Sequence, residues 1–268
     1  MNEIICPVCK CDLIQDDRVF KCENNHCFDV SKFGVLNLSL NNKSSKKRHG
    51  DDKLMVLSRK AFLDNGYYEP IRDSVVSLAK KHINQNSFLL DAGCGEGYYT
   101  EALTKGLGFS SVCGIDVSKE ALRYFKKRLP LSNAIVSSIF NMPVKSNSVD
   151  LALNMFAPVS ATEFARVIKK DGFLIRTFVL KEHLFELKQS IYDTAYYNDE
   201  DEVQLDGFEL VDFIKTEYVM HIEGEDIKNL FCMTPYYYKT SEKDQKKLEL
   251  LDKLDTTVSV MSAIYKKL

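Results

Sequence analysis

The chain has 268 residues, of which 45% are hydrophobic and 28% charged, and this composition is typical of one large globular domain with a small accessory module. No stretch approaches about 18 consecutive apolar residues, and the first residues lack the basic and apolar runs of a secretory signal, so we expect a cytoplasmic protein without membrane contact. The net charge of -2 does not exclude an anionic partner, because residues 41–60 carry seven basic side chains against two acidic ones.

The first 40 residues show no helical period and predict short strands at 19–22 and 35–38. A polar, lysine-rich stretch at 41–52 has the composition of a linker. Two helices are expected next, at 54–62 and 70–83, because apolar residues recur there at helical spacing.

Five of the eight cysteines lie within the first 27 residues. Clustering at one end of a chain of this size indicates a metal site rather than a disulfide framework. Two pairs of ligands have the spacing of a closed, tetrahedral zinc site: Cys6, Cys9, Cys22 and His26. From the residues alone, Cys27 is an alternative fourth ligand because it adjoins His26, and Cys11 is expected to be an ordinary thiol.

From residue 87 onward, short apolar runs alternate with helical patterns. Strands are expected at 87–90, 112–115, 134–137, 149–155 and 172–178. Helices are expected at 98–105, 119–128 and 161–168. This β-α-β-α-β order predicts a parallel, doubly wound α/β sheet. A run at 208–222, a helix at 226–232 and a run at 257–265 are expected to supply the last strands.

A glycine-rich turn, from Asp91 to Gly97, follows the first of these strands and opens the first of these helices. Glycine lets the backbone approach a ligand closely and adopt positive φ. The spacing Gly93-x-Gly95-x-Gly97 is shorter than that of dinucleotide sites and makes little provision for a pyrophosphate, which favours a cofactor without phosphate. Asp116 ends the next strand, where a carboxylate can accept hydrogen bonds from both hydroxyls of a ribose.

Five segments resemble the motifs of class I methyltransferases and occur in the same order: 89–97, 114–118, 136–144, 149–153 and 165–174. The resemblance implies a Rossmann-like fold with S-adenosylmethionine as the cofactor. It places the cofactor against the glycine turn and the next strand, at Asp91, Gly93, Gly95, Glu96, Gly97 and Asp116.

Nearly the whole chain resembles the bacterial 23S rRNA (guanine-N1)-methyltransferases of the RlmA family. The segments that carry this resemblance are 6–9, 22–38, 50–51, 59–73, 95–100, 156–158, 183–188 and 233–235. It implies one structural zinc ion on Cys6, Cys9, Cys22 and His26, and it adds Tyr68 and His183 to the cofactor contacts. It also implies a hairpin in domain II of 23S rRNA as the substrate, and a homodimer. Two features depart from the family pattern. Cys27 replaces a polar residue, which leaves ligand exchange on zinc open, and residues 139–141 are less basic than in one subgroup, which leaves the subgroup open.

The loop after the fourth of these strands is expected to hold the target base, because ligands of open α/β sheets bind at the carboxyl ends of the strands. Its pocket residues are Asn154, Phe156, Ala157 and Pro158. N1 lies on the Watson–Crick edge of guanine, so the base must be unpaired or splayed out before transfer. The sequence does not indicate which residue accepts the N1 proton, so we name no catalytic residue.

These patterns divide the chain into a zinc-binding module at 1–40, a basic linker with helices at 41–84 and a methyltransferase domain at 85–268. Two other functions fit parts of the pattern. A methyltransferase for a small molecule would share the fold but has less use for the zinc module. A zinc-ribbon RNA-binding adaptor with a silent methyltransferase-like domain would not need an intact glycine turn. A nicotinamide dehydrogenase is disfavoured by the glycine spacing.

Overall fold

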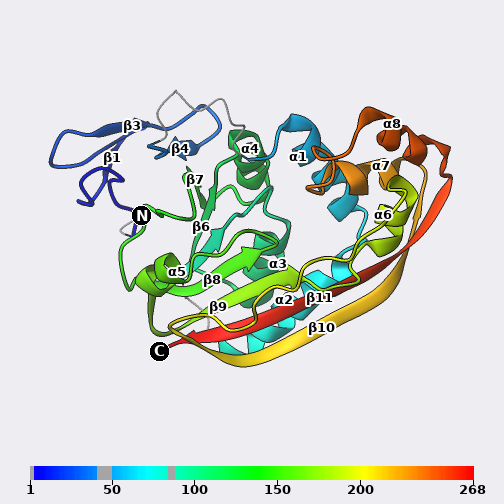
Figure 1. The fold of residues 1–268 in the computed structure, drawn as a ribbon. Helices are drawn as coiled ribbons and strands as arrows, with labels where there is room; N and C mark the ends of the chain where they lie inside the picture. The colour runs from blue at the N-terminus through cyan, green and yellow to red at the C-terminus, as the bar shows by residue number, and fades with distance from the viewer. Residues whose placement is uncertain (1–2, 41–49, 84–87) are drawn as a thin grey trace.

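A computed structural model describes residues 3–40, 50–83 and 88–268 of the chain (Figure 1). The predicted boundaries after residues 40 and 84 adjoin stretches outside the described residues, at 41–49 and 84–87. The lysine run of the predicted linker also lies outside them. The division into three parts therefore stays a prediction.

One large sheet of eight strands has the order β10-β11-β9-β8-β5-β6-β7-β4. Its strands are β4 (Val35–Asn37), β5 (Phe88–Ala92), β6 (Ser111–Asp116), β7 (Asn133–Val136), β8 (Val149–Met155), β9 (Ile168–Val179), β10 (Phe208–Glu223) and β11 (Lys253–Lys267). The strands from β4 to β9 pair in parallel, which confirms the predicted parallel sheet. The two carboxyl-terminal strands differ from it, because β11 and β10 each pair antiparallel with their neighbours. The sheet is therefore mixed and mostly parallel.

Helices cover the sheet and gather at one end of it. They are α1 (Lys53–Asp64), α2 (Glu69–His82), α3 (Tyr98–Leu107), α4 (Lys119–Arg128), α5 (Ala161–Val167), α6 (Phe185–Ile191), α7 (Glu225–Cys232), α8 (Glu242–Gln245) and the short 3-10 helix η1 (Lys246–Leu250). The helices α6, α7 and α8 gather around the end of the long β10–β11 pair (Figure 1). Among the described residues, no helix has the length and apolarity that a membrane crossing requires.

Two hydrophobic cores lie on opposite faces of the sheet. Successive residues of a strand point to opposite faces, and Leu89 belongs to one core whereas Leu90 belongs to the other. The first core includes the buried sides of α2, α3 and α4. The second includes Phe164 of α5 together with Phe20 and Leu36 from the amino-terminal part of the chain. The amino-terminal module therefore covers one face of the sheet and shares its core.

The module consists of a small antiparallel sheet, β1 (Ile14–Asp16), β2 (Val19–Lys21) and β3 (Cys27–Asp29), followed by β4. The N–H of Ile5 donates to the carbonyl of Pro143 at 3.0 Å, and the N–H of Lys145 donates to the carbonyl of Glu3 at 2.8 Å. The strand predicted at 35–38 is present as β4, but it pairs with β7 in the large sheet. The module and the methyltransferase-like sheet are thus joined by backbone hydrogen bonds.

Candidate cofactor and metal sites

The glycine-rich turn connects β5 to α3 and has left-handed backbone at each of its glycines. The φ angles are +89° at Gly93, +53° at Gly95 and +89° at Gly97, a region that other residues adopt only with strain. A Cβ atom at Gly93 would lie 2.7 Å from the Cβ of Ala157, and one at Gly97 would lie 2.8 Å from the ring of Phe125. Glycine is therefore favoured by conformation at all three positions, and at Gly93 and Gly97 it is required by space as well.

Asp116, at the end of β6, is hydrogen-bonded to the glycine turn. Its Oδ2 accepts from the N–H of Gly95 at 2.9 Å, and its Oδ1 accepts from the N–H of Ser118 at 2.8 Å. Burial raises the pKa of the Asp116 carboxyl, and these two N–H groups oppose that rise by stabilising the charged form. Each carboxylate oxygen has a second lone pair, so Asp116 can hold the turn and also accept from a ribose hydroxyl.

Asp91, near the end of β5, is buried beneath the turn. Its Oδ2 accepts a hydrogen bond from the hydroxyl of Thr100 on α3. The pKa of the Asp91 carboxyl is raised to about 7, mainly by burial; the hydrogen bond from Thr100 opposes this rise, and the charges of Asp116 and Glu96 add to it. The charge of Asp91 consequently depends on pH near neutrality and on what binds beside it.

Four buried polar atoms of this region have no hydrogen-bond partner among the described residues. They are Asp91 Oδ1, Glu96 Oε1, Tyr99 Oη and Asn154 Oδ1. Three belong to the turn or to the first residues of α3, and the amide of Asn154 donates to the carbonyl of Ala92 at 3.2 Å. Buried polar groups are nearly always hydrogen-bonded. The residues present therefore fit a ligand that is rich in hydrogen-bond donors, as S-adenosylmethionine is.

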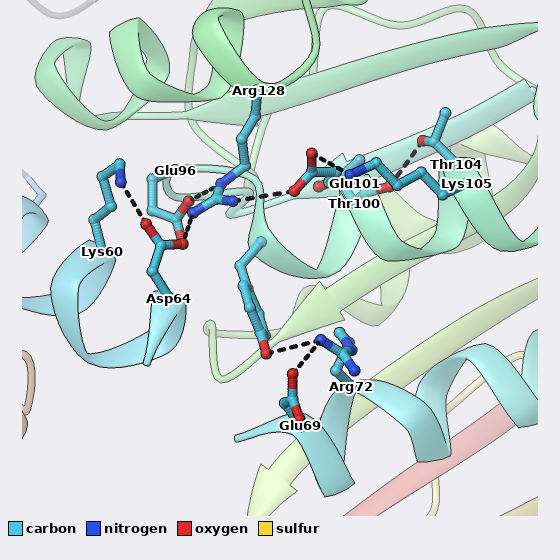
Figure 2. Close-up of polar contacts among 11 residues, drawn as sticks. Lys60, Asp64, Glu69, Arg72, Glu96, Thr100, Glu101, Thr104, Lys105 and Arg128 are labelled. Carbon is cyan, nitrogen blue, oxygen red and sulfur yellow. Dashed lines mark hydrogen bonds and ion pairs between the residues drawn. The ribbon is translucent and has the colours of Figure 1, made fainter. Parts of the chain in front are cut away.

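Glu96 is tied to neighbouring helices through Arg128 (Figure 2). The Glu96 side chain is 2% exposed, and its Oε2 accepts from Nε of Arg128 at 2.6 Å. Arg128 also donates to Glu101 of α3 at 3.0 Å and pairs with Asp64 of α1. Burial raises the pKa of the Glu96 carboxyl, and Arg128 opposes that rise. This network fixes the turn against α1, α3 and α4, and the predicted cofactor contact of Glu96 stays a prediction.

Tyr68 and His183 lie 115 residues apart in the chain, and the structure brings them together. Both are buried, with the Tyr68 hydroxyl 3.4 Å from Nε2 of His183. The N–H of Ser259 donates to Nδ1 of His183 at 3.3 Å. The pKa of His183 is lowered to about 3, mainly by burial and in smaller part by the charge of Lys188, so the ring is neutral. We assign the proton to Nε2, which then donates to Tyr68 and leaves the Tyr68 hydroxyl proton for another acceptor.

The loop after β8 brings Phe156 to the same place. Phe156 has a φ of +52° and is 39% exposed. Its ring centroid lies 6.3 Å from that of Tyr68 and 6.4 Å from that of His183. Asn154, by contrast, is fully buried, and its amide donates to the carbonyls of Ala92 and Pro158. Of the predicted pocket residues, Phe156 thus faces outward, whereas the Asn154 amide braces the loop and its Oδ1 lacks a partner.

Some residues of the site were not predicted from the sequence. Tyr99 and Thr100 lie in the first turn of α3, which begins at Tyr98. The start of this helix determines where their side chains point. Arg128 lies at the end of α4, outside the motifs. Arg59 lies in α1, at the start of a segment that carries the family resemblance, but nothing in that segment predicts its contact with the turn.

The metal-ligating side chains predicted in the module form one cluster. The ligand atoms of Cys6, Cys9, Cys22 and His26 all lie within 4.8 Å of one another. Sγ of Cys9 and Sγ of Cys22 are 3.6 Å apart, and Nδ1 of His26 is 3.6 Å from Sγ of Cys6 and 3.3 Å from Sγ of Cys22. A tetrahedral zinc ion with Zn–S bonds of ~2.3 Å separates its sulfur ligands by roughly 3.8 Å. The four side chains therefore fit zinc.

The other two cysteines of the module lie outside this cluster. Cys27 is exposed, and its Sγ contacts the carbonyl of Asn25 at 3.5 Å. Cys11 contacts the carbonyl of Cys9 and accepts from the side chain of Asn24. The structure thus places His26, and not Cys27, beside the three clustered cysteines.

Comparison with known proteins agrees with this geometry. Residues 90–176 match the family described as a methyltransferase domain, and residues 4–46 match the family described as RlmA, N-terminal. A 23S rRNA (guanine(748)-N1)-methyltransferase of Streptomyces fradiae is 29% identical over 189 residues, which cover 69% of this chain and 66% of that protein.

Two further relatives are named provisionally as 23S rRNA (guanine-N1)-methyltransferases. The one from Micromonospora griseorubida is 30% identical over 202 residues and covers 68% of this chain and 67% of that protein. YxjB of Bacillus subtilis is 26% identical over 268 residues and covers 95% and 94%. The chain thus spans about two thirds of the first two relatives and nearly all of the third.

The fold, the glycine turn and the partnerless polar atoms beside it define a class I methyltransferase that depends on S-adenosylmethionine. The zinc-binding cluster and the relatives narrow that class. The chain belongs to the RlmA family of 23S rRNA (guanine-N1)-methyltransferases.

Proposed function

We propose that the protein transfers the methyl group of S-adenosylmethionine to N1 of a guanine in a hairpin of domain II of 23S rRNA. One observation carries the proposal: the four-ligand cluster of an RlmA-type module packs onto the same sheet that carries the cofactor turn. The relative from Streptomyces fradiae is named for this reaction. A cytoplasmic location is part of this proposal, because its substrate is ribosomal RNA.

The cofactor contacts in this proposal lie at the carboxyl ends of β5 and β6, as ligands of open α/β sheets do. The glycines of the turn let the cofactor approach the backbone, Asp116 accepts from its ribose, and two carboxylates offer further oxygens. The contacts near the turn are Asp91, Gly93, Gly95, Glu96, Gly97 and Asp116. Tyr68 and His183, which contact each other, complete the set. S-adenosylmethionine supplies a methyl group that is already activated, so the main task of the protein is to position the reacting atoms.

The target guanine in this proposal enters beside the loop after β8. Phe156 offers an exposed aromatic face at the edge of the Tyr68–His183 pair, on which a splayed base can stack. Its left-handed backbone is costly for a non-glycine residue, and such strain is concentrated at functional sites. Asn154 and Ala157 hold this loop against the turn, and Pro158 extends the surface beside it.

The module holds one structural zinc ion on Cys6, Cys9, Cys22 and His26 in this proposal. Four protein ligands close a tetrahedral site and leave no position for substrate. The metal therefore stabilises the part of the chain that covers one face of the sheet, rather than acting on the RNA.

We also propose that the protein acts as a homodimer. The edge strand β10 is 16 residues long, and Phe213 and Val219 on its outward side are 52% and 55% exposed. A long edge strand with apolar side chains is prone to pair with another chain. A second copy of the protein would cover it.

Methylation of a defined RNA tests the proposed reaction. Purified protein and isotope-labelled S-adenosylmethionine are incubated with unmodified 23S rRNA, or with 16S rRNA as the control, and the nucleosides are separated by mass spectrometry. We expect label in 1-methylguanosine from 23S rRNA only. Label in another nucleoside, or no label in RNA, would contradict the proposal and favour a small-molecule methyltransferase or a silent adaptor.

A further inference from the structure

Arg59 lies directly over the glycine turn, although it belongs to α1, which precedes the sheet. A Cβ atom at Gly95 would have one neighbour within 4 Å among the described residues, and that neighbour is Nη1 of Arg59, at 3.9 Å. The guanidinium group therefore faces the backbone that the cofactor must approach. The side chain is 28% exposed, so it is partly shielded from water.

Neighbouring residues hold this guanidinium in place. Nη1 pairs with the carboxylate of Asp51, and Nη2 donates to the carbonyl of Met233 at 3.1 Å. The carbonyl of Asp51 in turn accepts from the hydroxyl of Ser118 at 2.8 Å, next to Asp116. These contacts use two of the five N–H donors of a guanidinium. Arg59 is thus fixed in position and retains donors for another anion.

The charges around the turn explain what that anion is. Three acidic side chains surround the turn: Asp91, Glu96 and Asp116. Burial raises the pKa values of Glu96 and Asp116, and the charge of Arg59 lowers both. Arg128 is engaged by Glu96, Glu101 and Asp64 (Figure 2). S-adenosylmethionine has two cationic groups, the sulfonium and the ammonium, and one anionic group, the carboxylate. The acidic side chains are opposite in charge to the two cationic groups, and Arg59 is opposite in charge to the carboxylate.

We propose that Arg59 binds the carboxylate of the methionyl part of S-adenosylmethionine through charge-assisted hydrogen bonds. An arginine is well matched to this task, because its planar fork of donors fits the two oxygens of a carboxylate. The inference rests on the proposed cofactor site. It adds a contact from α1, a helix in which the resemblance places no cofactor residue. It therefore makes α1 part of the site.

A pair of ligands that differ only in the carboxylate tests the proposal. Isothermal titration calorimetry compares S-adenosylmethionine with its decarboxylated form, on the wild-type protein and on Arg59→Gln. We expect the wild type to bind S-adenosylmethionine at least roughly tenfold more tightly than the decarboxylated form, and Arg59→Gln to lose this preference. The affinity for the decarboxylated form should change less than about threefold in Arg59→Gln.

The control is Lys60→Gln, which removes the same charge from the next residue of α1. Lys60 points to Asp64 and not to the turn (Figure 2), so the preference for the carboxylate should persist. Equal losses of affinity for both ligands in Arg59→Gln would overturn the proposal and show a structural role. A wild type without preference would overturn it too, even where Arg59→Gln does not fold. A wild type that binds neither ligand would instead refute the cofactor site itself.

Discussion

The carboxylate of Asp116 accepts a hydrogen bond from the backbone N–H of Gly95 at 2.9 Å, and this contact joins the end of β6 to the turn that follows β5. The same carboxylate accepts from Ser118 at the start of α4. Asp116 therefore holds the turn in its left-handed course, and its carboxylate has further lone pairs for the ribose contact that we propose.

Replacement of Asp116 by alanine should weaken cofactor binding by at least roughly tenfold, because a charged hydrogen-bond acceptor is lost. Titration calorimetry with S-adenosylhomocysteine measures the effect. Asp171→Ala is the matched control, because Asp171 is an exposed residue of β9 that pairs with Lys266, away from the turn. An affinity of Asp116→Ala equal to that of the wild type would refute the ribose contact.

Cofactor binding should depend on pH through Asp91. Burial raises the pKa of this carboxyl to about 7 from its usual value of 3.8, so the ligand-free protein holds the proton between these values. Its contribution to folding stability is present at pH values below 3.8 and is lost as the pH rises through about 7. A cationic cofactor favours the charged form, so affinity should rise by up to tenfold per pH unit toward pH 7 and then level off.

Calorimetric titrations between about pH 5.5 and pH 8 check this dependence on Asp91. In Asp91→Asn the affinity should be weaker and nearly independent of pH, because the titrating group is absent. A wild-type affinity that is flat over this range, or that rises as the pH falls, would show that the cofactor does not bind beside an Asp91 with a raised pKa.

Glycines flank α3 at both ends, and alanine substitutions at these two positions separate the cost of backbone strain from the cost of lack of space. Gly108 ends the helix with a φ of +71° and nothing within 4 Å of a new Cβ, so Gly108→Ala should cost roughly 1–2 kcal/mol of unfolding free energy. At Gly97 the Cβ would also meet Phe125 at 2.8 Å, so Gly97→Ala should cost roughly 3 kcal/mol or more. Urea denaturation measures both values. Equal costs would mean that Phe125 does not press on the turn.

Loss of zinc should destabilise the large sheet, because the module shares its second core. Cys22→Ser removes one ligand and should lower both the zinc content and the melting temperature, as should a strong chelator. Cys27→Ser is the matched control, since Cys27 is exposed and outside the cluster. One zinc ion per chain in Cys27→Ser and less in Cys22→Ser is expected. Loss of zinc from Cys27→Ser as well as from Cys22→Ser would assign the fourth ligand to Cys27 in place of His26.

Truncation of Phe156 should separate substrate binding from cofactor binding. Phe156→Ala removes the exposed ring beside Tyr68 and His183, so methylation of 23S rRNA should fall by roughly tenfold or more through loss of base stacking. The affinity for S-adenosylhomocysteine should stay within about threefold of the wild-type value. Phe140→Ala, at another exposed phenylalanine, is the control and should retain activity. Equal activity of the two variants would exclude stacking on Phe156.

Local patterns predicted most of the elements of the fold. The strand expected at 149–155 is β8 with the same bounds, and Ser118 caps α4 by accepting from the N–H of Ala121. The pairing of β4 with β7 was not predicted, because strand pairing depends on contacts between distant segments that periodicity does not report. For the same reason the antiparallel pairing of β11 was missed. The short helix α6 was missed as well, since its seven residues are too few to show a period.

The site was predictable to the extent that its residues lie in motifs. The glycine turn and the acid at the end of the next strand follow from local spacing, and the structure joins them. The contact between Tyr68 and His183 spans 115 residues, so only the family resemblance could suggest it. The contact of Arg59 with the turn could not be predicted from the sequence, because its approach to Gly95 depends on how α1 packs against α4 and α7.

Primer extension on ribosomal RNA tests the central claim most directly, because a methyl group on N1 of guanine blocks base pairing and stops the polymerase. RNA is taken from cells with the gene, from cells without it, and from cells in which it carries Asp116→Ala. We predict a stop at one guanine of a hairpin in domain II of 23S rRNA that requires the intact gene. The absence of any stop that depends on the gene would contradict the assignment of guanine N1 as the methylated atom.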